Sequence, residues 1–167
     1  MINGEILDTF IDSKGKKNNG FKKNELNSAI CCLQTALKNK MNVQNGTVVY
    51  RGMSNKFDES INVGSQFYFS GFVSTSTSKK VAHRFRKSRL KEFRGEGKGT
   101  FMTITIQNNG IDENHPSYCL NIEDISLSPN QKEILICSHC YFQVTNIRKI
   151  HDIDYVDLVC KGYLLDN

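Results

Sequence analysis

The sequence predicts an α+β domain in which a helical N-terminal lead-in precedes two packed, mainly antiparallel β-sheets with a cleft between them. Residues 22–41 repeat apolar side chains at the period of a helix, whereas from Thr47 onward short runs rich in Val, Ile, Thr, Phe and Tyr follow one another. A helical block followed by a block of strands is typical of α+β folds. With 167 residues and no internal repeat, one domain over 1–167 is expected, with the lead-in over 1–46 and a β-rich core over 47–167.

The first helix is expected over residues 22–41, since apolar side chains recur there every three or four residues. These side chains are Leu26, Ile30, Leu33, Leu37 and Met41. A second helix is expected from about Lys79 to Lys91, with the preceding Ser-Thr cluster supplying its N-cap. Strands are expected at "TVVYR", "FYF", "GFVST", "TFMTITI", "EILIC", "YFQVTNI" and "YVDLVC".

The N-terminus bears on the compartment and on the cysteines. It lacks the basic start and apolar core of a signal peptide, and no apolar run is long enough to cross a bilayer. We therefore expect a cytoplasmic protein without membrane contact, while secretion without a visible leader stays open. The 6 cysteines are then expected to be free thiols in the core. Cys137 and Cys140 form a CxxC without a second normally spaced pair, so no metal site is expected.

Positive charge is concentrated in one stretch of the chain. The net charge is +5, and the segment from Lys79 to Lys98 holds nine basic residues against two acidic ones. Such a stretch can attract nucleic acid, an acidic protein surface or a phosphate-bearing ligand. It lacks interleaved aromatic side chains, and this favours a solvated helix face over a platform for single strands.

Three segments carry side chains suited to chemistry. "VVYRGM" places Arg51 and Gly52 at the end of a strand, "GFVSTSTS" places Ser-Thr-Ser at 74–76 in another, and "SPNQKEILI" places Gln131 and Glu133 before a third. The arginine is an always-charged fork that suits a phosphate, and the glycine would let a ligand approach the main chain. The serine hydroxyls suit the orientation of a carboxylate, while strand alternation sends the threonine to the opposite face.

In this order the three segments resemble the mono-ADP-ribosyltransferases of the arginine-serine-glutamate class, which include exoenzyme-like and ecto-transferase-like members. The resemblance extends from about Thr47 to the C-terminus and implies that the cleft binds NAD, as a substrate and without a metal. It implies that Glu133 stabilises the oxocarbenium-like ribose as nicotinamide leaves, and that Ser74 positions Glu133. It also implies that Arg51 binds the NAD phosphates and Gly52 the nicotinamide amide.

The same resemblance places Thr75 and Ser76 with the NAD-binding residues. It also places Phe85 against the nicotinamide ring, where a core contact of the second helix is the alternative. Arg84 and Arg86, on either side of it, would add to phosphate binding.

Gln131 departs from the pattern of the arginine-modifying members, which have a glutamate at this position. An amide cannot accept a proton from a guanidinium, but it can hold an acceptor side chain by hydrogen bonds. The Gln-x-Glu form resembles bacterial exoenzymes that modify asparagine or glutamine, so an amide or hydroxyl acceptor is favoured over arginine. Those exoenzymes have an aromatic residue where this chain has Ser128, and this puts their route of target recognition in doubt.

Other functions stay open on the sequence alone. The same cleft would serve an NAD glycohydrolase, in which water captures the ribosyl cation, and an inactive NAD-binding or protein-binding module would retain the fold. The partner of a transferase would be an unidentified protein acceptor or a nucleic-acid acceptor. The oligomeric state is left unassigned.

Overall fold

The computed structural model describes residues 43–69, 71–92, 97–107, 118–123, 127–137 and 140–162. The expected helix over residues 22–41 and most of the lead-in lie outside the described residues. Among the described residues, no helix is long and apolar enough to cross a membrane.

Eight strands and one α-helix make up the regular structure of the described residues. The strands are β1 (Val48–Met53), β2 (Gln66–Tyr68), β3 (Val73–Ser76), β4 (Thr100–Ile106), β5 (Cys119–Asn121), β6 (Glu133–Ile136), β7 (Tyr141–Ile150) and β8 (Ile153–Gly162). The helix is α3 (Lys79–Lys87), and two short 3-10 turns are η1 (Leu90–Glu92) and η2 (Pro129–Gln131). All seven expected strand segments form strands. The three-residue strand β5 was not predicted, since it is too short to show an alternating pattern.

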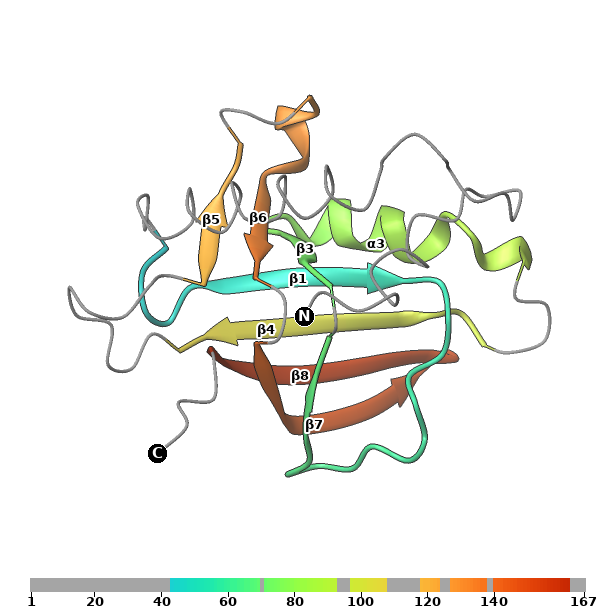
Figure 1. Ribbon diagram of the computed structural model, residues 1–167. Helices are drawn as coiled ribbons and strands as arrows, with labels where there is room; N and C mark the ends of the chain where they lie inside the picture. Colours follow the sequence, from blue (N-terminus) through green and yellow to red (C-terminus); the bar gives the residue numbers. More distant parts are fainter. Residues whose placement is uncertain are drawn as a thin grey trace, which may run out of the picture.

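The strands form one continuous sheet in the order β2-β7-β8-β4-β1-β3-β6-β5. β4 and β8 pair in parallel and the other neighbours pair antiparallel, so the expectation of mainly antiparallel strands is confirmed. The expectation of two separate sheets is wrong, because β1 and β3 are joined at the pair Tyr50↔Ser76. In Figure 1, β1, β4 and β8 run across the view, whereas β5 and β6 run steeply to them. The sheet therefore changes direction between β1 and β3.

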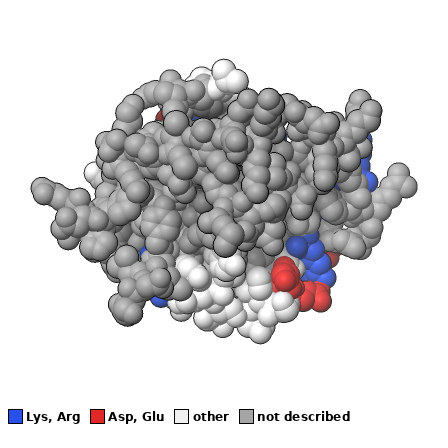
Figure 2. All heavy atoms as spheres, in the orientation of Figure 1, with Lys and Arg blue, Asp and Glu red and all other residues white. Residues whose placement is uncertain are grey.

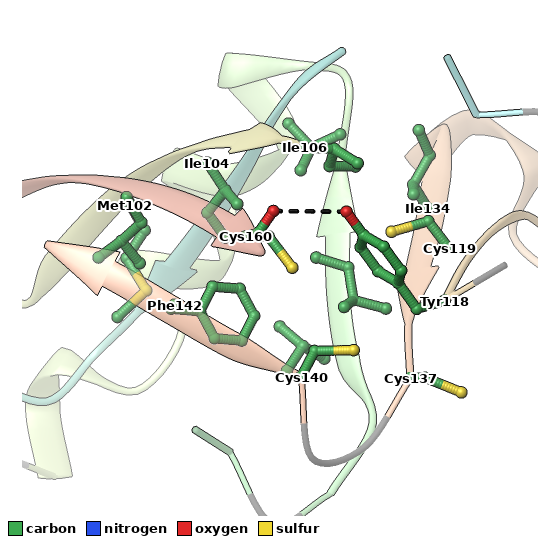
Figure 3. Close-up of a cluster of buried hydrophobic side chains, with 14 of the residues drawn as sticks. Met102, Ile104, Ile106, Tyr118, Cys119, Ile134, Cys137, Cys140, Phe142 and Cys160 are labelled. Carbon is green, nitrogen blue, oxygen red and sulfur yellow. Dashed lines mark hydrogen bonds between the residues drawn. The ribbon is translucent and has the colours of Figure 1, made fainter. Parts of the chain in front are cut away.

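The hydrophobic core draws side chains from both halves of this sheet. Met102, Ile104 and Ile106 alternate along β4, Phe142 comes from β7, and Ile136 comes from β6. All five are at most 1% exposed. Figure 3 shows Met102, Ile104, Ile106 and Phe142 between the ribbons of the two halves. The two halves thus bury one core between them, as two packed sheets would.

Helix α3 lies along β1 on the side away from β7 and β8 (Figure 1). It begins as expected after a serine, since the hydroxyl of Ser78 accepts a hydrogen bond from the N–H of Val81 at 3.4 Å. It ends at Lys87, four residues before the expected end, because the N–H of Ser88 closes a tighter turn onto the carbonyl of Phe85 at 3.2 Å. The chain then continues into η1.

Candidate active site

A cleft of about 490 Å³ is lined by residues of β1, β3, α3 and the turn that leads into β6. Eight of the residues singled out from the sequence line it, namely Arg51, Gly52, Ser74, Thr75, Ser76, Phe85, Gln131 and Glu133, whereas Arg84 and Arg86 do not. It therefore lies beside the junction of β1 and β3 and not between two sheets. Seven further lining residues were not singled out, namely Tyr50, Met53, Ser54, Asn55, Ala82, Ser88 and Arg89. Tyr50 and Met53 directly flank Arg51 and Gly52 in the chain, which is the signal that could have found them, whereas the other five carry no such signal.

The three hydroxyls of the Ser-Thr-Ser segment each bond to a different part of the segment around Glu133. Ser74 Oγ donates to Glu133 Oε1 at 2.5 Å, and Thr75 Oγ1 donates to the carbonyl of Ile134 at 2.6 Å. Ser76 Oγ donates to the carbonyl of Gln131 at 2.5 Å. Side chain and main chain of the Gln-x-Glu segment are thus held from β3, across 55 to 59 residues of sequence. Thr75 is 4% exposed.

The turn before β6 sets the direction in which Glu133 enters the strand. Lys132 follows η2 with a φ of 48°, in the left-handed region, and its N–H bonds to the carbonyl of Pro129 at 3.1 Å. A residue other than glycine in this conformation costs about 1 kcal/mol. The carbonyl of Lys132 accepts from the N–H of Thr77 at 3.1 Å, so β3 also holds this turn. Glu133 is then the first residue of β6.

Arg51 is a largely buried cation at the β1 side of the cleft. Its Nη1 donates to the carbonyl of Ser74 at 2.9 Å, and its guanidinium carbon lies 5.6 Å from the centre of the Phe69 ring. Burial lowers the pKa of Arg51 from its usual value, but a guanidinium titrates so high that the side chain stays charged. Its Nε is buried without a hydrogen-bond partner in the described part of the chain. A buried N–H of this kind is costly unless a ligand satisfies it.

The structure gives a packing explanation for the glycine at position 52 that the sequence did not reveal. A Cβ at this position would lie 1.8 Å from the carbonyl oxygen of Ala82 and 2.7 Å from the nitrogen of Arg86, both main-chain atoms of α3. The glycine is therefore required for the close approach of α3 to β1. The expectation that its missing side chain also serves the approach of a ligand stays a prediction, since Gly52 lines the cleft as well.

Phe85 lies on α3 and is 46% exposed, so it is not the buried core contact that was the alternative reading. Because it also lines the cleft, its ring is available to a bound molecule.

The basic residues around Phe85 differ in their surroundings. Arg86 is 4% exposed; its Nε donates to His83 Nδ1 at 3.2 Å and its Nη1 donates to the carbonyl of Lys98. Its expected part in phosphate binding is wrong, because the guanidinium holds α3 to the chain before β4. Arg84 is exposed and is not among the cleft residues. Arg89 does line the cleft, and its N–H bonds to Ser54 Oγ at 3.0 Å.

Four cysteines of the described chain, Cys119, Cys137, Cys140 and Cys160, are buried free thiols. Burial raises the pKa of Cys119, so its reactive thiolate is disfavoured. Among the described residues there is no group of three or more His, Cys, Asp or Glu side chains placed to hold a metal ion. These thiols belong to the core shown in Figure 3, and none of them is among the cleft residues.

Comparisons with known proteins agree with this geometry. The family described as NAD:arginine ADP-ribosyltransferase matches residues 13–162. No curated protein matches the chain in sequence. Solved structures that are similar include the Vis toxin of Vibrio splendidus, with 20% identity and a TM-score of 0.64 over 93% of this chain and 66% of that chain. Exoenzyme S of Pseudomonas aeruginosa has 16% identity and a TM-score of 0.63 over 98% and 70% of the two chains.

The C3 exoenzyme of Clostridium limosum has 14% identity and a TM-score of 0.61 over 95% of this chain and 80% of that chain. At these identities the likeness establishes the fold, which is that of the ADP-ribosyltransferases, with a large sheet and one helix in the described residues. The chain spans a little under two thirds of the length of the Vis toxin chain.

Proposed function

Since this chain belongs to the NAD:arginine ADP-ribosyltransferase family, whose enzymes use NAD as substrate, we propose that it is a mono-ADP-ribosyltransferase. It would cleave NAD at the bond between nicotinamide and ribose and transfer ADP-ribose to an acceptor. The observation that carries this proposal is the meeting of Arg51, Ser74 and Glu133 in one cleft, with the Ser74 hydroxyl 2.5 Å from the Glu133 carboxylate. The cleft volume of about 490 Å³ lies in the range of ligand pockets.

Glu133 would act on the charge that develops as nicotinamide leaves. The bond from the ribose carbon to the nicotinamide nitrogen breaks with its electrons going to nicotinamide, so positive charge builds up on the sugar. A fixed carboxylate stabilises this charge more in the transition state than in bound NAD. The hydrogen bond from Ser74 orients that carboxylate before the reaction. Thr75 and Ser76 support it by holding the main chain of β6 and of Gln131; direct contacts of these two residues with NAD stay a prediction.

The remaining cleft residues would bind the two ends of NAD. Arg51 presents a buried guanidinium N–H without a partner among the described residues, which suits a phosphate oxygen. Arg89 adds a second cation to the same cleft, as a diphosphate would require. Gly52 would anchor the nicotinamide amide through its main chain, and the exposed ring of Phe85 would cover the nicotinamide. In support, the related exoenzyme S has been solved with carba-NAD bound.

Gln131 bears on the acceptor. Its carbonyl accepts a hydrogen bond from Ser76, and the residue lines the cleft together with Glu133. A neutral amide can donate to and accept from an amide or hydroxyl group, but it cannot take the proton of a guanidinium. We therefore assign an amide or hydroxyl acceptor to this chain, although the family is described by its action on arginine.

Nicotinamide release from NAD by the purified chain tests the first half of the reaction. Glu133→Gln is expected to slow release by about 10²- to 10³-fold, the scale of removing one preorganised electrostatic group. Glu59→Gln is the matched control, because this exposed carboxylate pairs with Lys56 and is not among the cleft residues. Equal release by wild type and Glu133→Gln would refute the assignment of Glu133.

NAD labelled in its adenine ring tests the transfer. Covalent label on a macromolecule, lost in Glu133→Gln, is expected for a transferase. Free ADP-ribose as the only product would instead identify an NAD glycohydrolase. NAD binding without release of nicotinamide would identify an inactive NAD-binding module.

A further inference from the structure

Three cations lie on α3 outside the cleft, and nothing described in the fold accounts for them. Lys80, Arg84 and Lys87 follow one another at intervals of four and three residues, so they form one stripe along the helix. All three are exposed, and within the described part of the chain none has an ion-pair partner. We call these three residues the cationic stripe. In Figure 2 small groups of basic side chains lie at the right-hand edge of the face in view.

Other cations of α3 have contacts that explain them. The ammonium group of Lys79 lies 5.4 Å from the centre of the Tyr50 ring, a favourable cation–π distance. Arg86 is buried and hydrogen-bonded to His83 and Lys98. The stripe differs from both, because its side chains contribute no such contact to the fold.

Helix electrostatics account for only part of the stripe. Lys80 stands in the first turn of α3, where the helix dipole favours acidic side chains, whereas Arg84 and Lys87 stand in the last turn, where it favours cations. The pairs Lys80 and Arg84, and Arg84 and Lys87, place like charges on adjacent turns of one face, which also destabilises a helix. The stripe therefore calls for a partner that supplies negative charge.

The stripe lies at the edge of the cleft. The cleft is lined by Ala82, Phe85 and Ser88 of α3 and its C-cap, and Ser88 lies four residues after Arg84, so these two residues are neighbours on the helix surface. Arg89 in the cleft extends the positive charge toward the reacting centre. A partner held along the stripe would reach the mouth of the cleft.

We propose that the cationic stripe binds the phosphate backbone of a nucleic acid and that this nucleic acid is the ADP-ribose acceptor. The inference rests on the proposed function and names the acceptor class. From Lys80 to Lys87 the helix rises by about 10 Å, a length that matches about three phosphates at 3.4 Å each. Nucleic acids also present hydroxyl and ring-amide groups, the acceptor types that suit Gln131.

The composition of the stripe favours a nucleic acid over an acidic protein. Protein interfaces bury an apolar core and are poor in lysine, whereas Val81 and Ala82 next to the stripe are already buried in this chain. Contacts to a phosphate backbone need cations and little else. Phe85 is the exposed aromatic of α3, and it belongs to the cleft.

The transfer balances without a further reactant. The bond between ribose carbon and nicotinamide nitrogen breaks, and nicotinamide leaves with the electron pair. An oxygen or nitrogen of the nucleic acid forms the new bond to the ribose carbon, and its proton passes to water. Because the stripe is distinct from Glu133 and Arg51, binding and chemistry can be measured separately.

Binding is tested with fluorescent 20-nucleotide RNA and DNA strands, by anisotropy over a range of salt concentrations and without NAD. The triple variant Lys80→Gln, Arg84→Gln, Lys87→Gln is expected to bind at least about tenfold more weakly, with a salt slope smaller by about 2. The control variant Arg148→Gln, Lys149→Gln, Lys161→Gln removes the same charge from β7 and β8. No binding by wild type, or an equal loss in both variants, would overturn the proposal, as would stronger binding of poly-glutamate than of either strand.

Transfer is tested with the same strands and adenine-labelled NAD. Wild type is expected to label a strand, Glu133→Gln to label none, and the stripe variant to label at least about tenfold less while releasing nicotinamide at the wild-type rate. Unlabelled strands beside Glu133-dependent nicotinamide release would overturn the nucleic-acid acceptor and leave the proposed NAD cleavage standing. Absence of nicotinamide release would refute both the proposed function and the role of the nucleic acid as acceptor. The anisotropy measurement would then test only whether the cationic stripe binds a nucleic-acid backbone.

Discussion

Replacing Gly52 by alanine separates two explanations of the glycine that directly follows Arg51. The added Cβ would lie 1.8 Å from the carbonyl oxygen of Ala82 and 2.7 Å from the nitrogen of Arg86. Both are main-chain atoms of α3, so no side chain can rotate away. Restoring an ordinary contact of about 3.5 Å requires a displacement of about 1.5 Å between α3 and β1.

Overpacking of this kind costs about 1–3 kcal/mol. For a chain of this size that loss lowers the melting temperature by about 3–10 °C. Because α3 carries Phe85, the displacement is also expected to raise the KM for NAD. Thermal unfolding by circular dichroism and nicotinamide-release kinetics measure the two effects.

Gly71→Ala is the matched control, because a Cβ there would meet no atom within 4 Å and its φ is not in the left-handed region. If Gly52→Ala melted with the control and only its KM rose, the packing explanation would fail. The glycine would then serve the approach of a ligand, as its place in the sequence motif first indicated.

Three further changes test the remaining contacts. Ser74→Ala removes a hydrogen bond to a carboxylate, worth about 1.5–3 kcal/mol. It is expected to slow nicotinamide release about 10- to 100-fold with little change in melting temperature. An unchanged rate would show that Glu133 does not depend on the hydrogen bond from Ser74. Arg51→Lys cannot replace the buried fork and is expected to raise the Kd for NAD at least about tenfold by calorimetry; unchanged affinity would place the phosphates elsewhere. Burial, and then neighbouring cations, lower the pKa of His83 from its usual value of 6.5, so the unfolded chain takes up a proton at this site before the folded chain does. The free energy of unfolding is therefore expected to fall as the pH drops below about 6.5, and urea titrations should show a smaller fall in His83→Gln; identical pH profiles would contradict the expectation.

Sequence patterns predicted most of the described fold because the signals are local. β-branched and aromatic runs marked seven strands, and Ser78 marked the start of α3. The family resemblance, read from three short segments, is confirmed by the match over residues 13–162. The strand β5 was missed because three residues carry no measurable period.

Long-range contacts explain what the sequence could not show. Arg51 meets the carbonyl of Ser74 across 23 residues, and Ser74 meets Glu133 across 59. Local propensities cannot predict contacts between residues so far apart in the sequence, since these contacts depend on which strands become neighbours in the sheet. The burial of Arg86 was not predicted for the same reason. Its carbonyl accepts a hydrogen bond from Ser54 and its guanidinium donates to the carbonyl of Lys98, and both partners lie on other segments of the chain.

The sequence by itself determined the residue types of this site, the order of its motifs and the strands that carry them. Only the tertiary structure decided that two expected sheets join at Tyr50 and Ser76, that Gly52 serves the packing of α3, and that Lys80, Arg84 and Lys87 are left outside the cleft. The physical reason is that propensity acts between neighbours in the chain, whereas pairing, close contact and burial depend on the position of every other segment.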